Sequence, residues 1–204
     1  MKDIHIQQLN NLRQEKGFMT IDEIMALVDN GNIIFDPLSV LISVSAVIGK
    51  GNTLYPCISL QVTEGSTLQI GDNNIFYSNT FFLADKGSLL VEDGNQFGDG
   101  GCTIKANVPQ AKIEVGSHGR YVNGCQVYGK TTLGSGSQII GPIVAQNVDL
   151  AAGEAHSSVD YNEKAAVLKG HGLARDISVG KGEVINGQGS FVQSDIEKQV
   201  TYHE

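Results

Sequence analysis

The segment V115-G-S-H-G-R-Y-V-N-G-C-Q-V-Y-G-K-T-T-L-G-S-G136 decides the fold, because it repeats its own pattern. Its residues Val115, Tyr121, Val127 and Leu133 lie six positions apart, and V-G-S returns eighteen residues later as L-G-S. A period of six matches neither the helical repeat of about 3.6 nor the alternation of a long strand. It predicts a solenoid whose strands turn a corner every six residues, so that three sides form one coil.

The same spacing continues on both sides of this segment. Further members of the series are Ile42, Ile48, Leu54, Leu60, Ile70, Phe76, Phe82, Ile139, Ala145, Val179, Ile185 and Phe191. Five members of the whole series are followed by glycine, which suits a tight corner, namely Ile48, Ile70, Val115, Leu133 and Val179. The ten-residue step from Leu60 to Ile70 predicts a small loop at 63–67, whereas the register of 83–112 is not evident. Tyr121 occupies an aliphatic position, which predicts local widening or an outward hydroxyl.

Three segments depart from the repeat. Residues 1–36 are predicted to be a helical cap, with one helix over 3–16 and a second opened by the capping box T20-I-D-E23. The solenoid is expected over 37–195, interrupted by an excursion at 154–176. Within that excursion, D160-Y-N-E163 predicts the start of a short helix at about 161–169. A tail follows at 196–204.

Composition excludes several classes of protein. The 204 residues carry a net charge of -8, which argues against a nucleic-acid surface. Cys57, Cys102 and Cys125 form no C-x-x-C pair, and no two histidines have metal-ligand spacing, so neither a disulfide framework nor a metal site is expected. No signal-peptide core and no apolar run of about 18 residues occurs, so the prediction is a cytoplasmic protein that binds no membrane.

Four hexads resemble the hexapeptide-repeat family of left-handed parallel β-helices, and the resemblance extends over roughly residues 40–195. They are V115-G-S-H-G-R, L133-G-S-G-S-Q, I70-G-D-N-N-I and V179-G-K-G-E-V. The resemblance implies an all-β solenoid with a left-handed coil and a short N-terminal helical segment. Most known members are acyltransferases. It therefore implies an acyl-CoA-dependent O- or N-acyltransferase, similar to acetyltransferases, that acts as a homotrimer without a metal.

Such an enzyme would transfer the acyl group of acetyl-CoA or another acyl-CoA to a small hydroxyl or amino compound, for example a sugar. The family usually employs one histidine as general base, which suits proton transfer near neutral pH. His156 and His171 bracket the excursion, and His118 lies at a turn, so these three are the candidate catalytic residues. Lys169, Arg175 and Lys181 are candidate cations for the coenzyme phosphates. Each of these six residues also has a simpler interpretation as a solvated surface side chain.

A second interpretation stays open. The chain lacks the H-P or N-H pairs of serine- and galactoside-type acyltransferases, and it lacks the H-L-x-Y segment of the UDP-sugar type. These departures favour a non-catalytic β-helix that serves as a scaffold, assembly or ligand-binding protein. Fold resemblance alone does not decide between the two.

Overall fold

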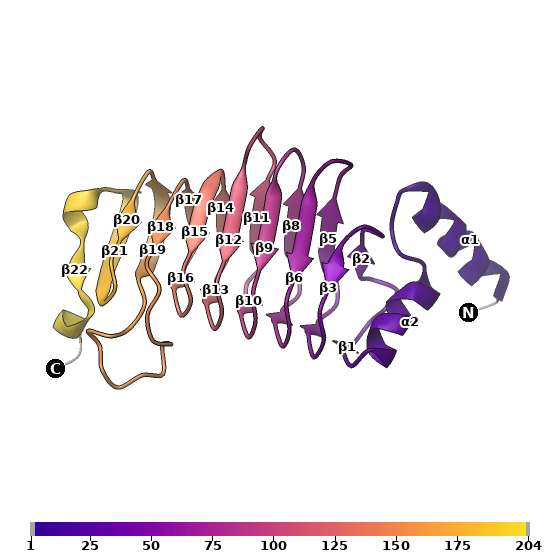
Figure 1. Cartoon of the computed structure of the whole chain (residues 1–204), viewed down its shortest axis with the longest axis horizontal. Helices are drawn as coiled ribbons and strands as arrows, with labels where there is room; N and C mark the ends of the chain where they lie inside the picture. Colours follow the sequence, from indigo (N-terminus) through magenta and orange to yellow (C-terminus); the bar gives the residue numbers. More distant parts are fainter. Residues whose placement is uncertain (1–2, 203–204) are drawn as a thin grey trace.

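The computed structural model describes residues 3–202, and it forms a left-handed parallel β-helix with three faces (Figure 1). Face 1 contains β1 (Ile33–Ile34), β4 (Thr53–Leu54), β7 (Ile75–Phe76), β10 (Gln96–Gly98), β13 (Arg120–Val122) and β16 (Gln138–Ile140). Face 2 contains β2 (Leu41–Ile42), β5 (Ser59–Val62), β8 (Thr80–Ala84), β11 (Cys102–Ala106), β14 (Cys125–Tyr128) and β17 (Ile143–Gln146). Face 3 contains β3 (Val47–Ile48), β6 (Thr67–Ile70), β9 (Ser88–Val91), β12 (Lys112–Val115), β15 (Lys130–Leu133), β18 (Asp149–Leu150) and β20 (Ser178–Val179). β19 (Val167–Arg175) and β21 (Glu183–Phe191) turn the corner and belong to faces 1 and 2.

Short elements close the two ends of the solenoid (Figure 1). At the N-terminal end lie α1 (Asp3–Glu15) and α2 (Ile21–Asp29), and the predicted capping box is present, since Thr20 accepts from the Glu23 amide and Glu23 accepts from the Thr20 amide. At the C-terminal end lie η1 (Gln193–Asp195), β22 (Glu197–Lys198) and η2 (Gln199–Tyr202). Within residues 3–202, no helix has the length and apolar character needed to cross a bilayer.

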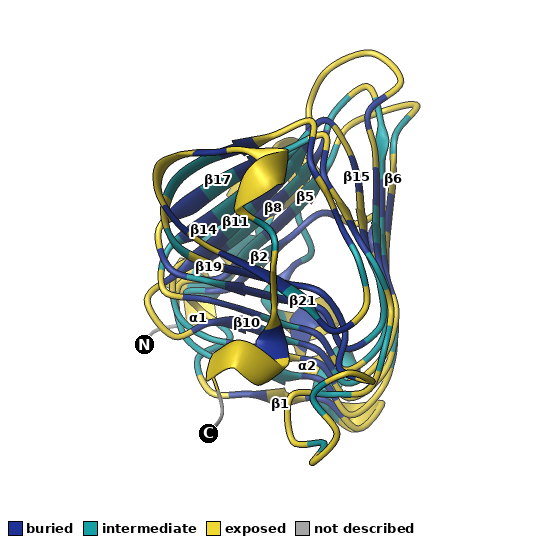
Figure 2. Cartoon of the chain, turned by 90° about the vertical axis from the view of Figure 1, so that its left-hand side faces the viewer, coloured by how far each residue is buried: buried dark blue, intermediate teal, exposed yellow. Residues whose placement is uncertain are grey.

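The six-residue series forms the core, as predicted. Val115, Tyr121, Val127 and Leu133 are each at most 2% exposed, and the buried residues line the inside of the coil (Figure 2). Val115 pairs with Leu133, eighteen residues further on, so equivalent positions stack in successive coils. Parallel neighbours are about 4.8 Å apart, so the inward apolar residues of each coil pack on those of the coil before it.

Coil length varies along the chain, which is why the register of 83–112 was not evident from the sequence. Gln96 pairs with Arg120, a step of twenty-four residues, whereas Arg120 pairs with Gln138 after eighteen. The extra residues lie between faces 2 and 3, since β8 and β11 are five residues long and a turn follows each. The predicted loop at 63–67 is the first of these turns, between Val62 and Thr67.

Buried asparagines connect four successive coils at the corner that precedes face 1. Asn52 accepts the amide N–H of Asn74 at 2.9 Å, and Asn74 accepts that of Asn95 at 2.9 Å. Asn95 in turn accepts the Gly119 N–H at 2.7 Å. Each side chain thus satisfies the backbone of the next coil, where a buried amide would otherwise lack an acceptor.

The hydroxyl of Tyr121 does not point outward, and that part of the sequence expectation is wrong. Tyr121 is completely buried, and its Oη lies 3.0 Å from the Ser137 Oγ of the next coil. Gly119 makes room for the ring, because a Cβ there would lie 2.2 Å from the tyrosine oxygen. Burial raises the pKa of this phenol far above its usual value, so it stays protonated.

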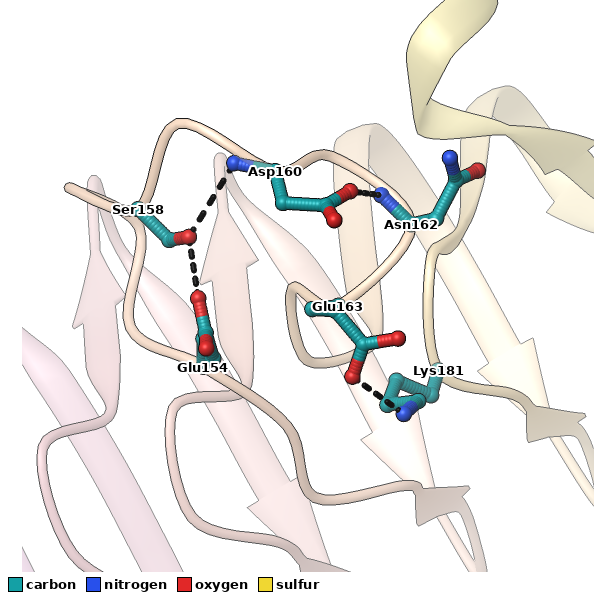
Figure 3. A network of polar contacts seen from close by, with 6 residues as sticks. All are labelled: Glu154, Ser158, Asp160, Asn162, Glu163 and Lys181. Carbon is teal, nitrogen blue, oxygen red and sulfur yellow. Dashed lines mark hydrogen bonds and ion pairs between the residues drawn. The ribbon is translucent and has the colours of Figure 1, made fainter.

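The excursion contains no helix, so the helix predicted at 161–169 is wrong. The chain leaves the coil after Glu154 and rejoins it at Lys164, which forms a parallel bridge with Glu154. The Asp160 carboxylate caps only a turn, accepting the Asn162 N–H at 3.0 Å (Figure 3). Residues 165–168 are buried where the chain enters β19. Their apolar side chains therefore belong to a strand and do not form the apolar face of a helix. The detour is therefore residues 155–163, which we call the excursion loop.

Candidate functional site

The three candidate histidines lie at separate places. His118 occupies the corner between β12 and β13, His171 lies at the corner within β19 opposite Gln188, and His156 lies on the excursion loop. All three side chains are exposed. His156 lines the groove described below and the other two do not, so the structure does not bring the three together in one site.

His118 has the geometry of a turn residue. Its φ is +60°, in the left-handed region, and its N–H donates to the Asp93 carbonyl at 2.9 Å. The same corner holds positive-φ residues in other coils, namely Gly51, Asn73, Gly94 and Gly136. Its imidazole also covers Gly94, where a Cβ would lie 2.6 Å from Nδ1. The side chain therefore packs on the preceding coil.

Replacing His118 by glycine is expected to leave the free energy of unfolding within about 0.5 kcal/mol of the wild type, because glycine adopts a positive φ without strain. His118→Val should instead cost about 1–2 kcal/mol, because a β-branched residue resists this conformation. Urea unfolding of both variants measures the difference. Equal stability of the two would contradict a turn role.

A groove of about 360 Å³ lies on the outer side of face 1, near the C-terminal end. It is lined by Arg120, Gln138, Ile140, His156, Lys164, Val167, Lys169, Val184, Asn186, Gln199 and Tyr202. Alternate residues of a strand point to the same side of the sheet, and the register between coils places these residues in rows. Gln138 pairs with Val167, which pairs with Val184, and the parallel row is Ile140, Lys169 and Asn186. These two rows form the floor of the groove.

The sides of the groove come from the two segments that depart from the coil. The excursion loop contributes His156, and Lys164 follows where the chain rejoins the solenoid. A second part of the wall comes from the C-terminal segment, which contributes Gln199 and Tyr202 and in which β22 pairs antiparallel with β21. There Gln199 donates to the carbonyls of Ala165 at 2.7 Å and Glu183 at 3.2 Å, which fixes the segment on the last coil.

The groove is positively charged although the chain is acidic. Arg120, Lys164 and Lys169 line it, and no aspartate or glutamate does. Lys164 is only 9% exposed, with its Nζ 4.1 Å from the centre of the Tyr161 ring. Arg120 and Lys169 form no ion pair or hydrogen bond through their side chains with the described residues. Such a cationic concavity attracts anions from solution.

The three cations expected to bind a coenzyme do not converge. Lys169 lies in the groove, whereas Arg175 is on face 2, where its Nε donates to Gln146 at 3.1 Å. Lys181 forms an ion pair with Glu163 at 2.6 Å (Figure 3), and this hydrogen bond raises the lysine pKa. Of the three, only Lys169 is therefore available to a ligand in the groove.

Sequence reasoning missed Arg120 and Gln138. Each directly precedes an inward residue of the six-residue series, Tyr121 and Ile139, so each points outward at the same place in consecutive coils. Their eighteen-residue separation was a usable signal. Within residues 3–202, no group of three or more histidine, cysteine or acidic side chains is arranged to hold a metal.

The strand pairing and the three faces define the chain as a left-handed parallel β-helix protein. No protein-family model matches the chain, and no curated protein matches it either. Among solved structures it is similar to LpxA from Acinetobacter baumannii, with 16% sequence identity and a TM-score of 0.38. That match covers 77% of this chain and 69% of the other.

Proposed function

We propose that the groove is an acyl-transfer site, in which an acyl thioester of the coenzyme A class acylates a small hydroxyl or amino compound. The observation that carries the proposal is the meeting of His156 with cations that lack carboxylate partners. The hexads that resemble acyltransferases support the same reaction. Lys169 is the cation proposed to bind a phosphate of the donor, because phosphates attract unpaired ammonium groups.

The reaction needs a base and a donor of hydrogen bonds. His156 would accept the proton of the acceptor as its oxygen or nitrogen attacks the thioester carbonyl. The new ester or amide bond forms, the carbon–sulfur bond breaks, and the coenzyme leaves as a thiol after taking up the proton. The developing oxyanion requires N–H donors, and the side-chain amide of Asn186 in the floor, which is also hydrogen-bonded to Tyr202, is a candidate.

We expect His156→Gln to lower kcat by about 100-fold or more, because general-base catalysis typically contributes that much. His171→Gln should stay within about threefold of the wild type, since His171 lies outside the groove. Thiol release from acetyl-CoA and longer acyl-CoAs, with a panel of amino and hydroxyl acceptors, measures both. Unchanged turnover in His156→Gln, or no shift of melting temperature with any acyl-CoA, would reject the proposal.

A specific observation favours the non-catalytic alternative. No side-chain hydrogen bond orients His118, His156 or His171 among the described residues, whereas a catalytic base is commonly held by a partner. In that case the groove would bind an anionic ligand without turnover. Coenzyme binding with no thiol release on any acceptor distinguishes this alternative. The homotrimer and the cytoplasmic location stay predictions that follow from the resemblance.

A further inference from the structure

The side-chain amide of Gln138 lines the groove and forms no hydrogen bond with a described residue. The residue as a whole is 7% exposed, and its amide oxygen and nitrogen are accessible from the groove. A side-chain amide offers both N–H donors and an oxygen acceptor. Gln138 can therefore bond a ligand in the groove without giving up a partner in the chain.

Arg120 lies beside it on the same outward row. The two residues are direct partners in the register of β13 and β16. The arginine is partly exposed, and its guanidinium is unpaired within the described chain. A guanidinium presents a planar fork of donors that matches a carboxylate or a phosphate, and an adjacent amide can bond a neighbouring polar group.

The rest of the floor limits the ligand further. Val167 and Val184 continue the Gln138 row and offer an apolar surface to a carbon skeleton. The groove volume of about 360 Å³ suits a small metabolite rather than a polymer. Because no acidic side chain lines the groove, a ligand with an anionic group is favoured over a cationic one.

We infer that Arg120 and Gln138 bind the acceptor by an anionic group, a carboxylate or a phosphate, with Gln138 bonded to an adjacent hydroxyl or amide. That this ligand is the acceptor rests on the proposed acyl transfer, whereas its binding requires no acyl donor. The acceptor then lies on the floor of the groove, and His156 on the excursion loop is the base that its reactive group meets. Lys169, in the neighbouring row, is left for the donor.

The test is calorimetric titration of the full chain, without thioester, with glucose 6-phosphate, glucuronate and glucose. These probes share a ring and carry a phosphate, a carboxylate or a hydroxyl at one end. At least one anionic probe is expected to bind about tenfold or more tightly than glucose, since a charge-assisted hydrogen bond to the guanidinium contributes that much to the affinity. The better anionic probe identifies the group. If neither anion binds more tightly than glucose, the inference is overturned.

Two variants locate the binding. Arg120→Gln should raise the Kd of the anionic probe about tenfold or more and leave that of glucose unchanged, whereas Lys130→Gln, an exposed cation on face 3, should change neither. Gln138→Leu should weaken binding of the probe while the melting temperature stays close to that of the wild type, because Gln138 forms no hydrogen bond with a described residue. A lower melting temperature with unchanged binding would show a structural role and reject the site. Because the titration contains no thioester, probe binding is measured independently of turnover, so failure of this inference and failure of the acyl transfer are separable.

Discussion

Replacing Gly172 by alanine is expected to detach the last coil of the solenoid from the coil before it. Gly172 lies at the corner of β19 with φ +127°, and an added Cβ would lie 1.8 Å from the carbonyl oxygen of Gly189. That atom belongs to the backbone of the next coil, so it cannot move aside as a side chain would. Strain at φ adds to the steric clash, and a loss of about 3 kcal/mol or more is expected.

The matched control is Gly189→Ala, at the paired corner position of β21. Gly189 also has a positive φ, of +82°, but nothing lies within 4 Å of an added Cβ. Gly189→Ala should therefore lower the free energy of unfolding by only about 1–2 kcal/mol, which is the strain of alanine at a positive φ. Hydrogen exchange measured by peptide should show fast exchange in β21 and β22 for Gly172→Ala alone, because each coil contacts only its neighbours. Equal protection in the two variants would contradict the close contact.

Phe97→Ala should destabilise the centre of the solenoid by about 3–5 kcal/mol. Phe97 is completely buried, and its ring stacks between Phe76 at 5.2 Å and Tyr121 at 5.4 Å. Phe82 meets it edge-on at 4.9 Å. Removing the ring leaves a cavity in the middle of this aromatic column, and a continuous coil cannot collapse into it without shifting its strands.

Phe35→Ala is the control for this variant. Phe35 is 59% exposed and contacts Tyr55 at the outer surface, with ring centroids 4.9 Å apart. Its loss should cost about 1 kcal/mol or less, since little area leaves the core. Equilibrium unfolding in urea measures both. A Phe97→Ala variant as stable as Phe35→Ala would mean that the column is not the core of the fold.

The six-residue series predicted the solenoid because one inward residue per face must recur wherever strands stack in parallel. The positions of Val115 and Leu133 follow directly from that requirement. The hydrogen bonds from Asn52, Asn74 and Asn95 to the next coil were not predicted, because the six-residue series identifies the inward apolar residues but not the bonds between corner side chains and the backbone. The helix at 161–169 was a wrong interpretation, since a polar turn followed by buried apolar residues has the same local signals as a capped helix.

The candidate site was only partly accessible from the sequence. His156 was named because it lies on the excursion, and Lys169 was named as a cation for the coenzyme phosphates; the structure puts both in one groove. The pairing of Arg120 with Gln138 depends on the register between coils, which an eighteen-residue step provides here. The C-terminal side of the groove depends on how β22 folds back on β21, a contact with no signal in the repeat.

The most direct test of the central claim, that the groove on face 1 is the ligand site, is hydrogen exchange of the full chain with and without coenzyme A. Amides of the excursion loop at 155–163 and of the C-terminal segment at 199–202 are predicted to exchange more slowly with the coenzyme, because they form the two sides of the groove. Protection confined to another face, or no protection at saturating coenzyme, would contradict the account.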